Sequence, residues 1–179
     1  DLGSGTGAYH ALFYGEEIGM GEQLGIPGRL SVRTPMQWTS GRNGGFSDAP
    51  TRRLTRPLVD GRFGPLAVNV ADQWRDPDSM LSWMERMIHI RRDCPEIGCG
   101  ALELLDVGVS AVLACLMVDG EQRVLTVHNI GAEPCAVRPR LDDASRAIDL
   151  LGRIDLAVES GQCEIVLGPY DYRWYRVMP

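Results

Sequence analysis

The stretch Leu12-Phe-Tyr-Gly-Glu-Glu-Ile-Gly-Met20 decides the fold expected for the first half of this chain, because it joins a short apolar run to a glycine and two adjacent carboxylates. A short apolar run bounded by glycine is typical of a strand buried on both faces of a parallel sheet. We therefore expect a buried strand over residues 11–14. Glycine, proline, asparagine and aspartate are frequent from there to Val70, which predicts a long loop that its aromatic residues keep ordered.

A helix is expected after this loop. Asp76-Pro-Asp78 carries start signals, since Asp76 can cap free N–H groups and a proline is tolerated in the first turn. Apolar residues from Met80 to Ile88 then recur at helical spacing, and Cys94-Pro95 ends the helix. We expect the methionine-rich face to pack against neighbouring elements, with a groove for a partner as the alternative.

The last third has the pattern of short antiparallel strands. Two β-rich runs, 109–118 and 123–130, are joined by Asp119-Gly120, a hairpin turn signal. Further strands are expected at 135–138, 147–151, 163–167 and 172–177. This spacing predicts a small antiparallel β-sandwich over residues 101–179, with the first part of the chain covering residues 1–100.

Composition limits the classes of function. The chain has 179 residues, whereas a closed eight-stranded β/α barrel needs about 250. The net charge of −6 argues against a nucleic-acid partner, and no apolar run approaches the roughly 20 residues of a membrane span. Without a signal-peptide pattern, we expect a cytoplasmic protein. An odd number of cysteines, five, then indicates reduced thiols. Cys94 and Cys99 are close in sequence, but no second cysteine or histidine pair lies at the spacing of a zinc site. We therefore expect no metal and no cofactor.

Glu16 and Glu17 are the first candidates for chemistry. Glycoside cleavage uses two carboxyl groups that flank one bond, about 5 Å apart in enzymes that retain configuration. Adjacent residues on a strand point to opposite faces, so Glu16 and Glu17 do not easily converge on one bond. We expect them to support a site rather than to act on the bond themselves.

Arg33-Thr-Pro-Met-Gln-Trp38 is the second candidate. A tryptophan face can stack on a sugar ring, while arginine and glutamine can hydrogen-bond to hydroxyl groups. Arg33, Gln37 and Trp38 are therefore candidate substrate-binding residues. The alternative is that Met36 and Trp38 only anchor the loop.

These segments, together with Gly45-Phe46 and Arg75-Asp-Pro-Asp-Ser79, resemble the α-amylase superfamily of glycoside hydrolases and, within it, its trehalose synthase-like members. The resemblance covers roughly residues 12–179. It implies the last strand, rim loop and last helix of a (β/α)8 TIM barrel, followed by a C-terminal β-domain. It also implies maltose, trehalose or an α-glucan as the ligand. The catalytic carboxylates of that family lie on earlier barrel strands, so the resemblance gives no catalytic residue here and predicts that the isolated chain is inactive.

Two other classes of function stay open. A non-catalytic carbohydrate-binding or folding module would use Trp38 and the β-domain without chemistry. Asp1-Leu-Gly-Ser-Gly-Thr-Gly7 resembles the glycine-rich motif of S-adenosylmethionine-dependent methyltransferases. That motif should follow a strand and open a helix, and Tyr14-Gly15 would break such a helix after two turns. The context therefore disfavours a methyltransferase. The oligomeric state is not indicated by the sequence.

Overall fold

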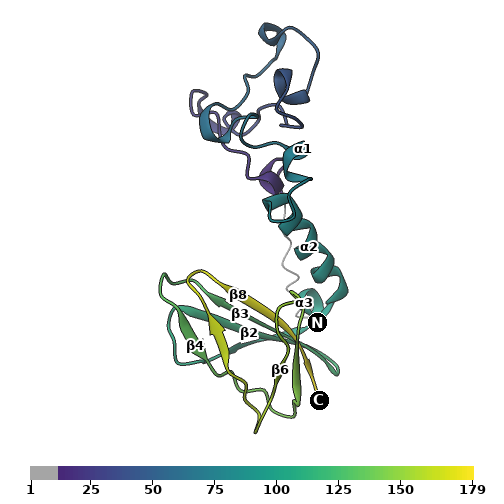
Figure 1. The fold of residues 1–179 in the computed structure, drawn as a ribbon, viewed down its shortest axis with the longest axis vertical. Helices are drawn as coiled ribbons and strands as arrows, with labels where there is room; N and C mark the ends of the chain where they lie inside the picture. Colours follow the sequence, from purple (N-terminus) through teal and green to yellow (C-terminus); the bar gives the residue numbers. More distant parts are fainter. Residues whose placement is uncertain (1–11) are drawn as a thin grey trace, which may run out of the picture. The chain divides into compact units, whose positions relative to one another are not determined.

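The computed structural model describes residues 12–179, which form two compact units (Figure 1). The N-terminal unit runs to His89 and the C-terminal unit runs from Ile90 to Pro179. The glycine-rich motif of residues 1–7 lies outside the described residues. None of the helices in the described part is long and apolar enough to cross a membrane.

The N-terminal unit consists of irregular backbone, short 3-10 turns and helices. Its elements are η1 (Glu16–Ile18), η2 (Gly28–Leu30), η3 (Arg42–Gly45), η4 (Thr51–Arg53), η5 (Gly61–Phe63), α1 (Val70–Gln73) and most of α2 (Met80–Asp93). The expected strand is not found at residues 12–14, where irregular backbone leads into η1. A strand needs a neighbouring strand for its hydrogen bonds, and no described segment of this unit pairs with residues 12–14.

Buried polar side chains hold the long loop region together. Gln37 donates from Nε2 to two carbonyl oxygens, 26 and 31 residues further along the chain. Asn43 donates to the carbonyls of Ser47 and Ala49 at 2.6 and 2.8 Å. Asn69 caps α1, since its Oδ1 accepts the Asp72 N–H at 2.9 Å. Buried amide groups need hydrogen-bond partners. These three side chains therefore bond to the loop backbone, which has no regular strand ladder of its own.

Helix α2 begins later than the sequence indicates. Its cap is Ser79, whose Oγ accepts the Ser82 N–H at 3.2 Å, and not Asp76. The Asp76 carboxylate instead accepts the N–H of Asp78 at 2.9 Å in the preceding turn. Asp76 was therefore the wrong cap, because its side chain is used one turn before the helix starts.

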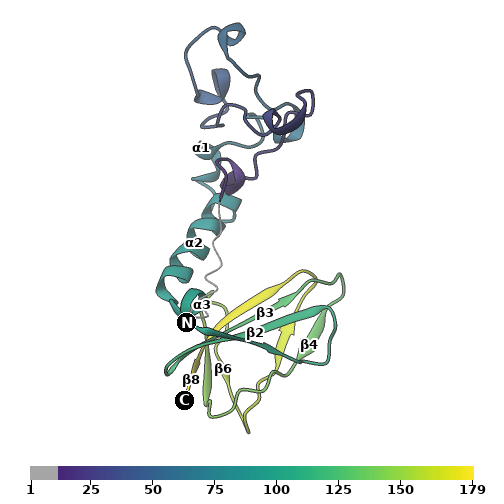
Figure 2. The ribbon, with the colours of Figure 1, turned by 180° about the vertical axis from the view of Figure 1, so that it is seen from behind.

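The C-terminal unit is an antiparallel β-domain, seen from behind in Figure 2. Its six-stranded sheet has the order β1-β2-β3-β8-β5-β6, and β4 and β7 form a second, two-stranded sheet. The strands are β1 (Ala101–Leu105), β2 (Val112–Asp119), β3 (Gln122–Asn129), β4 (Cys135–Val137), β5 (Arg146–Asp149), β6 (Leu156–Ala157), β7 (Ile165–Leu167) and β8 (Tyr172–Met178). The six strands expected from the sequence are present, and β1 and β6 are additional.

The main core lies between the two sheets. Leu125 on β3 faces Tyr175 on β8, and both pack with Ile165 and Leu167 of β7. Val124 and Met117, each one position away from a residue of the main core, point to the other face of the sheet and form a second cluster with Cys94. Alternation along each strand thus separates the two faces of the large sheet. The short helix α3 (Glu96–Cys99) and the end of α2 belong to the second face.

Candidate functional site

The N-terminal unit contains a cavity of about 480 Å³. Three segments line it: Tyr14 before η1 with Glu17 in η1, Arg33 to Met36 with Trp38, and Phe46 with Leu54 to Arg56. Binding sites for small molecules commonly have volumes of about 300 to 1,000 Å³. The cavity is therefore large enough for one or two sugar rings.

Aromatic side chains form much of the cavity wall. Trp38 and Phe46 are 49% and 52% exposed, so their ring faces are accessible to a ligand. Tyr14 donates from its hydroxyl to the carbonyl of Thr34 at 2.9 Å, which joins two of the lining segments. The arrangement provides flat apolar surfaces next to polar groups.

A tight turn places Phe46 in the same cavity as Trp38. Asn43, Gly44 and Gly45 have φ values of 52°, 64° and 70°, in the left-handed region. The Trp38 N–H donates to the Gly44 carbonyl at 2.8 Å and closes the turn. A Cβ at Gly45 would lie 2.7 Å from Thr39 Oγ1, so this position requires glycine.

Two arginines line the cavity without carboxylate partners in the described part of the chain. Arg56 donates to the adjacent Thr55 carbonyl at 3.2 Å, and Arg33 makes no ion pair. Glu17 is the single acid among the described lining residues, and its Oε2 accepts the Gly15 N–H at 2.7 Å. The guanidinium groups are thus available as hydrogen-bond donors.

Only some of the residues that the sequence nominates line the cavity. Arg33, Trp38 and Glu17 all line the cavity. Gln37 does not: its side chain is fully buried, and its Nε2 donates to the carbonyls of the η5 region and of Val68. Glu16 is exposed outside the cavity lining, and its Oε2 accepts the Phe13 N–H at 3.1 Å.

Several lining residues were not nominated from the sequence. Arg56 lies 23 positions after Arg33, and nothing in the local pattern connects them. Thr34 is 2% exposed, and its Oγ1 has no hydrogen-bond partner among the described residues. Phe46 follows a glycine pair, and only the left-handed turn shows that it lines the same cavity as Trp38.

The described residues contain no group of three or more histidine, cysteine or acidic side chains that could hold a metal ion. Cys94 is buried and receives a hydrogen bond from Arg176 at 3.1 Å, whereas Cys99 is exposed. Burial raises the pKa of the Cys94 thiol, so it is a neutral packing group.

Residues 121–176 match the family model described as the sucrose hydrolase-like C-terminal domain. The trehalose synthase of Pimelobacter sp. (strain R48) is 35% identical over 174 residues, which cover 93% of this chain and 30% of that protein. The trehalose synthase of Thermus thermophilus is 34% identical over 172 residues, which cover 94% of this chain and 18% of the relative. The chain therefore spans less than a third of the length of these relatives.

Solved structures agree with these relatives. The trehalulose synthase MutB, mutant A258V, is 26% identical with a TM-score of 0.64, over 83% of this chain and 26% of that one. The α-amylase from H. orenii, at 20% identity and a TM-score of 0.67, covers 92% of this chain and 31% of its own, and supports the fold alone. The chain is thus the C-terminal part of a trehalose synthase-like member of the α-amylase superfamily of glycoside hydrolases.

Proposed function

We propose that the cavity of the N-terminal unit binds a glucosyl unit of maltose, trehalose or an α-glucan, within an enzyme that transfers or hydrolyses α-glucosyl groups. The observation that carries this proposal is the pairing of exposed aromatic faces, Trp38 and Phe46, with the guanidinium of Arg33 in one cavity. Carbohydrate rings present apolar C–H faces and a rim of hydroxyl groups, and this lining offers a partner to each.

Four of the five residues nominated from the sequence have a distinct role in this proposal. Trp38 stacks on the ring, and Arg33 donates to hydroxyl oxygens. Glu17 has a carboxylate at the cavity that can accept a hydrogen bond from a sugar hydroxyl group. Gln37 acts indirectly, because its buried hydrogen bonds fix the backbone from which Trp38 projects.

The isolated chain, in this proposal, binds sugar without cleaving it. A retaining glycosidase needs two carboxyl groups about 5 Å apart on either side of the bond. Among the described lining residues only Glu17 is acidic, and Glu16 lies outside the lining. The reaction would therefore depend on carboxylates that other parts of the enzyme supply.

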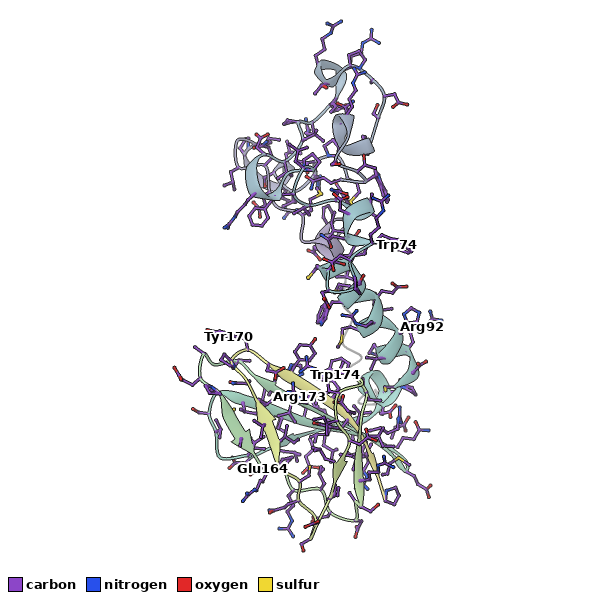
Figure 3. All side chains as sticks on the ribbon, viewed as in Figure 1. Trp74, Arg92, Glu164, Tyr170, Arg173 and Trp174 are labelled. Atoms are coloured by element: carbon purple, nitrogen blue, oxygen red, sulfur yellow. The ribbon has the colours of Figure 1, made fainter. Side chains whose placement is uncertain are left out.

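Binding is tested by titrating the purified chain with maltose and following tryptophan fluorescence and heat. We expect Trp38→Ala to weaken binding at least tenfold. Trp74→Ala is the matched control. Trp74, labelled in Figure 3, lies at the end of α1. It is 69% exposed and is not among the residues that line the cavity. Equal affinity of Trp38→Ala and the parent, or no binding by the parent, would contradict the proposal.

Turnover is tested by incubating the chain with maltose and measuring released glucose and trehalose. We expect neither product. Product formation that Glu17→Gln abolishes would show that this chain is catalytic alone. The mass of the gene product in its source cells, compared with 19.7 kDa, then separates a part of a larger enzyme from a free-standing binding module.

A further inference from the structure

We propose that the cavity of the N-terminal unit prefers a glucosyl ligand that carries a phosphate ester, with Arg33 and Arg56 binding the phosphate and Trp38 binding the ring. This inference rests on the proposed function, since it assumes that a sugar ring enters the cavity. It adds that the bound sugar carries an anionic group, a phosphate ester.

The first observation is the local charge. Residues 29–62 contain seven of the 18 arginines of the chain and only two acids, Asp48 and Asp60, although the whole chain has a net charge of −6. The segment that builds most of the cavity is thus strongly positive. Charge of one sign in a concave surface raises the local concentration of oppositely charged ligands.

The second observation is the state of the two arginines in the cavity. Neither Arg33 nor Arg56 forms an ion pair in the described part of the chain. Seven of the 18 arginines form ion pairs in the described part of the chain, such as Arg138 with Glu164 at 2.7 Å and Arg146 with Asp155 at 2.6 Å. Guanidinium groups match the geometry of phosphate oxygens, so two of them beside one cavity favour an anionic ligand.

The third observation excludes a bare anion site. Trp38, Phe46 and Tyr14 contribute aromatic surface to the same cavity, which inorganic phosphate could not use. The volume of about 480 Å³ also exceeds what a phosphate ion fills. A sugar phosphate engages both the aromatic and the basic part of the lining.

Calorimetric titrations of the purified chain with glucose 6-phosphate, glucose, maltose and inorganic phosphate test this inference. We expect glucose 6-phosphate to bind about tenfold more tightly than glucose, because charge-assisted hydrogen bonds are about twice as strong as neutral ones. Its affinity should fall as salt rises from about 0.05 to 0.5 M, while that for maltose stays constant.

Variants assign the effect to the cavity. Arg33→Gln and Arg56→Gln should each remove most of the preference for glucose 6-phosphate, and Arg33→Lys should restore part of it. Arg52→Gln is the matched control, because Arg52 is exposed in the same basic segment and does not line the cavity. Circular dichroism confirms that each variant is folded.

The outcomes are distinct. Equal binding of glucose 6-phosphate and glucose overturns this inference and leaves the proposed function intact. Binding of inorganic phosphate as tight as that of glucose 6-phosphate also overturns it, as does an equal loss in Arg52→Gln. Failure of every sugar to bind overturns the proposed function as well.

Discussion

Arg176 and Glu96 form an ion pair in which Nη1 and Oε1 are 2.6 Å apart and the Glu96 side chain is completely buried. The same guanidinium donates from Nη2 to the Asp93 carbonyl at 3.0 Å and to Cys94 Sγ at 3.1 Å. Glu96 opens α3 and Arg176 lies on β8, so one arginine ties the helical segment to the large sheet. The other carboxylate oxygen, Oε2, has no partner among the described residues.

Replacing Arg176 by methionine should lower the free energy of unfolding by about 3 kcal/mol or more, because it leaves the buried carboxylate without its counter-charge. Urea denaturation followed by circular dichroism measures this. Arg138→Met is the matched control, since its pair with Glu164 is also short, 2.7 Å, but both side chains are more than half exposed. That change should cost about 1 kcal/mol or less. Similar losses in both variants would show that burial does not matter here.

The same contacts predict where a protease separates the two units. The sequence places the boundary near residue 100, whereas the compact C-terminal unit begins at Ile90 and includes the buried Cys94 and Glu96. Limited digestion with proteinase K, which is not restricted to basic residues, should leave a resistant product that starts between residues 90 and 94. Mass spectrometry identifies its first residue. A stable product that starts after Gly100 would mean that α3 is not part of the folding unit.

His128 should make the C-terminal unit less stable in mild acid. Burial lowers the pKa of His128 below its ordinary value of 6.5, and its Nε2 accepts the Trp174 Nε1–H at 3.2 Å. The unfolded chain therefore takes up a proton at a higher pH than the folded chain does. The contribution of His128 to stability should be constant above about pH 7.5 and fall as the pH drops through 6.5.

Urea midpoints at pH 8 and pH 5.5 test this, with His128→Gln as the variant that lacks the titrating group. The variant should lose less stability between the two values than the parent. Asp171 does not interfere: burial opposes its charge, but hydrogen bonds from Arg173 and Arg153 hold its pKa well below the usual range. Its contribution is lost only as the pH falls below its ordinary value of 3.8. Identical pH dependence in parent and variant would exclude His128 as the cause.

Asn43 should be required for an ordered cavity. It has a φ of 52°, is 4% exposed, donates to two carbonyls and accepts the Thr51 hydroxyl at 2.8 Å. Asn43→Ala should lower the free energy that holds the turn in its folded conformation by about 1 to 3 kcal/mol. The variant loses these hydrogen bonds, and alanine disfavours the left-handed backbone. Trypsin should then cut at the neighbouring Arg52 and Arg53 several times faster, with weaker maltose binding. Ser40→Ala, an exposed position in the same loop, should change neither rate nor affinity.

Regular alternation made most of the C-terminal sheet predictable, and the exceptions have physical reasons. β1 has the sequence Ala-Leu-Glu-Leu-Leu, whose residues favour helices in isolation, and it becomes a strand because it pairs with β2 from Ala101↔Val118 to Leu105↔Ala114. β6 has only two residues, too few to show a period. Tertiary pairing overrides local preference in the first case and creates the strand in the second.

The sequence by itself determined the antiparallel β-domain, the approximate position of the long helix and the family to which the chain belongs. These follow from local periodicity and from characteristic sequence motifs. Only the tertiary structure decided which side chains share the cavity. It buries Gln37 beneath the loop, and it brings Phe46 and Arg56 beside Trp38 and Arg33. The physical reason is that a left-handed turn at Asn43 and buried amide hydrogen bonds over more than 20 residues position this loop. Such distant contacts leave no periodic pattern in the sequence.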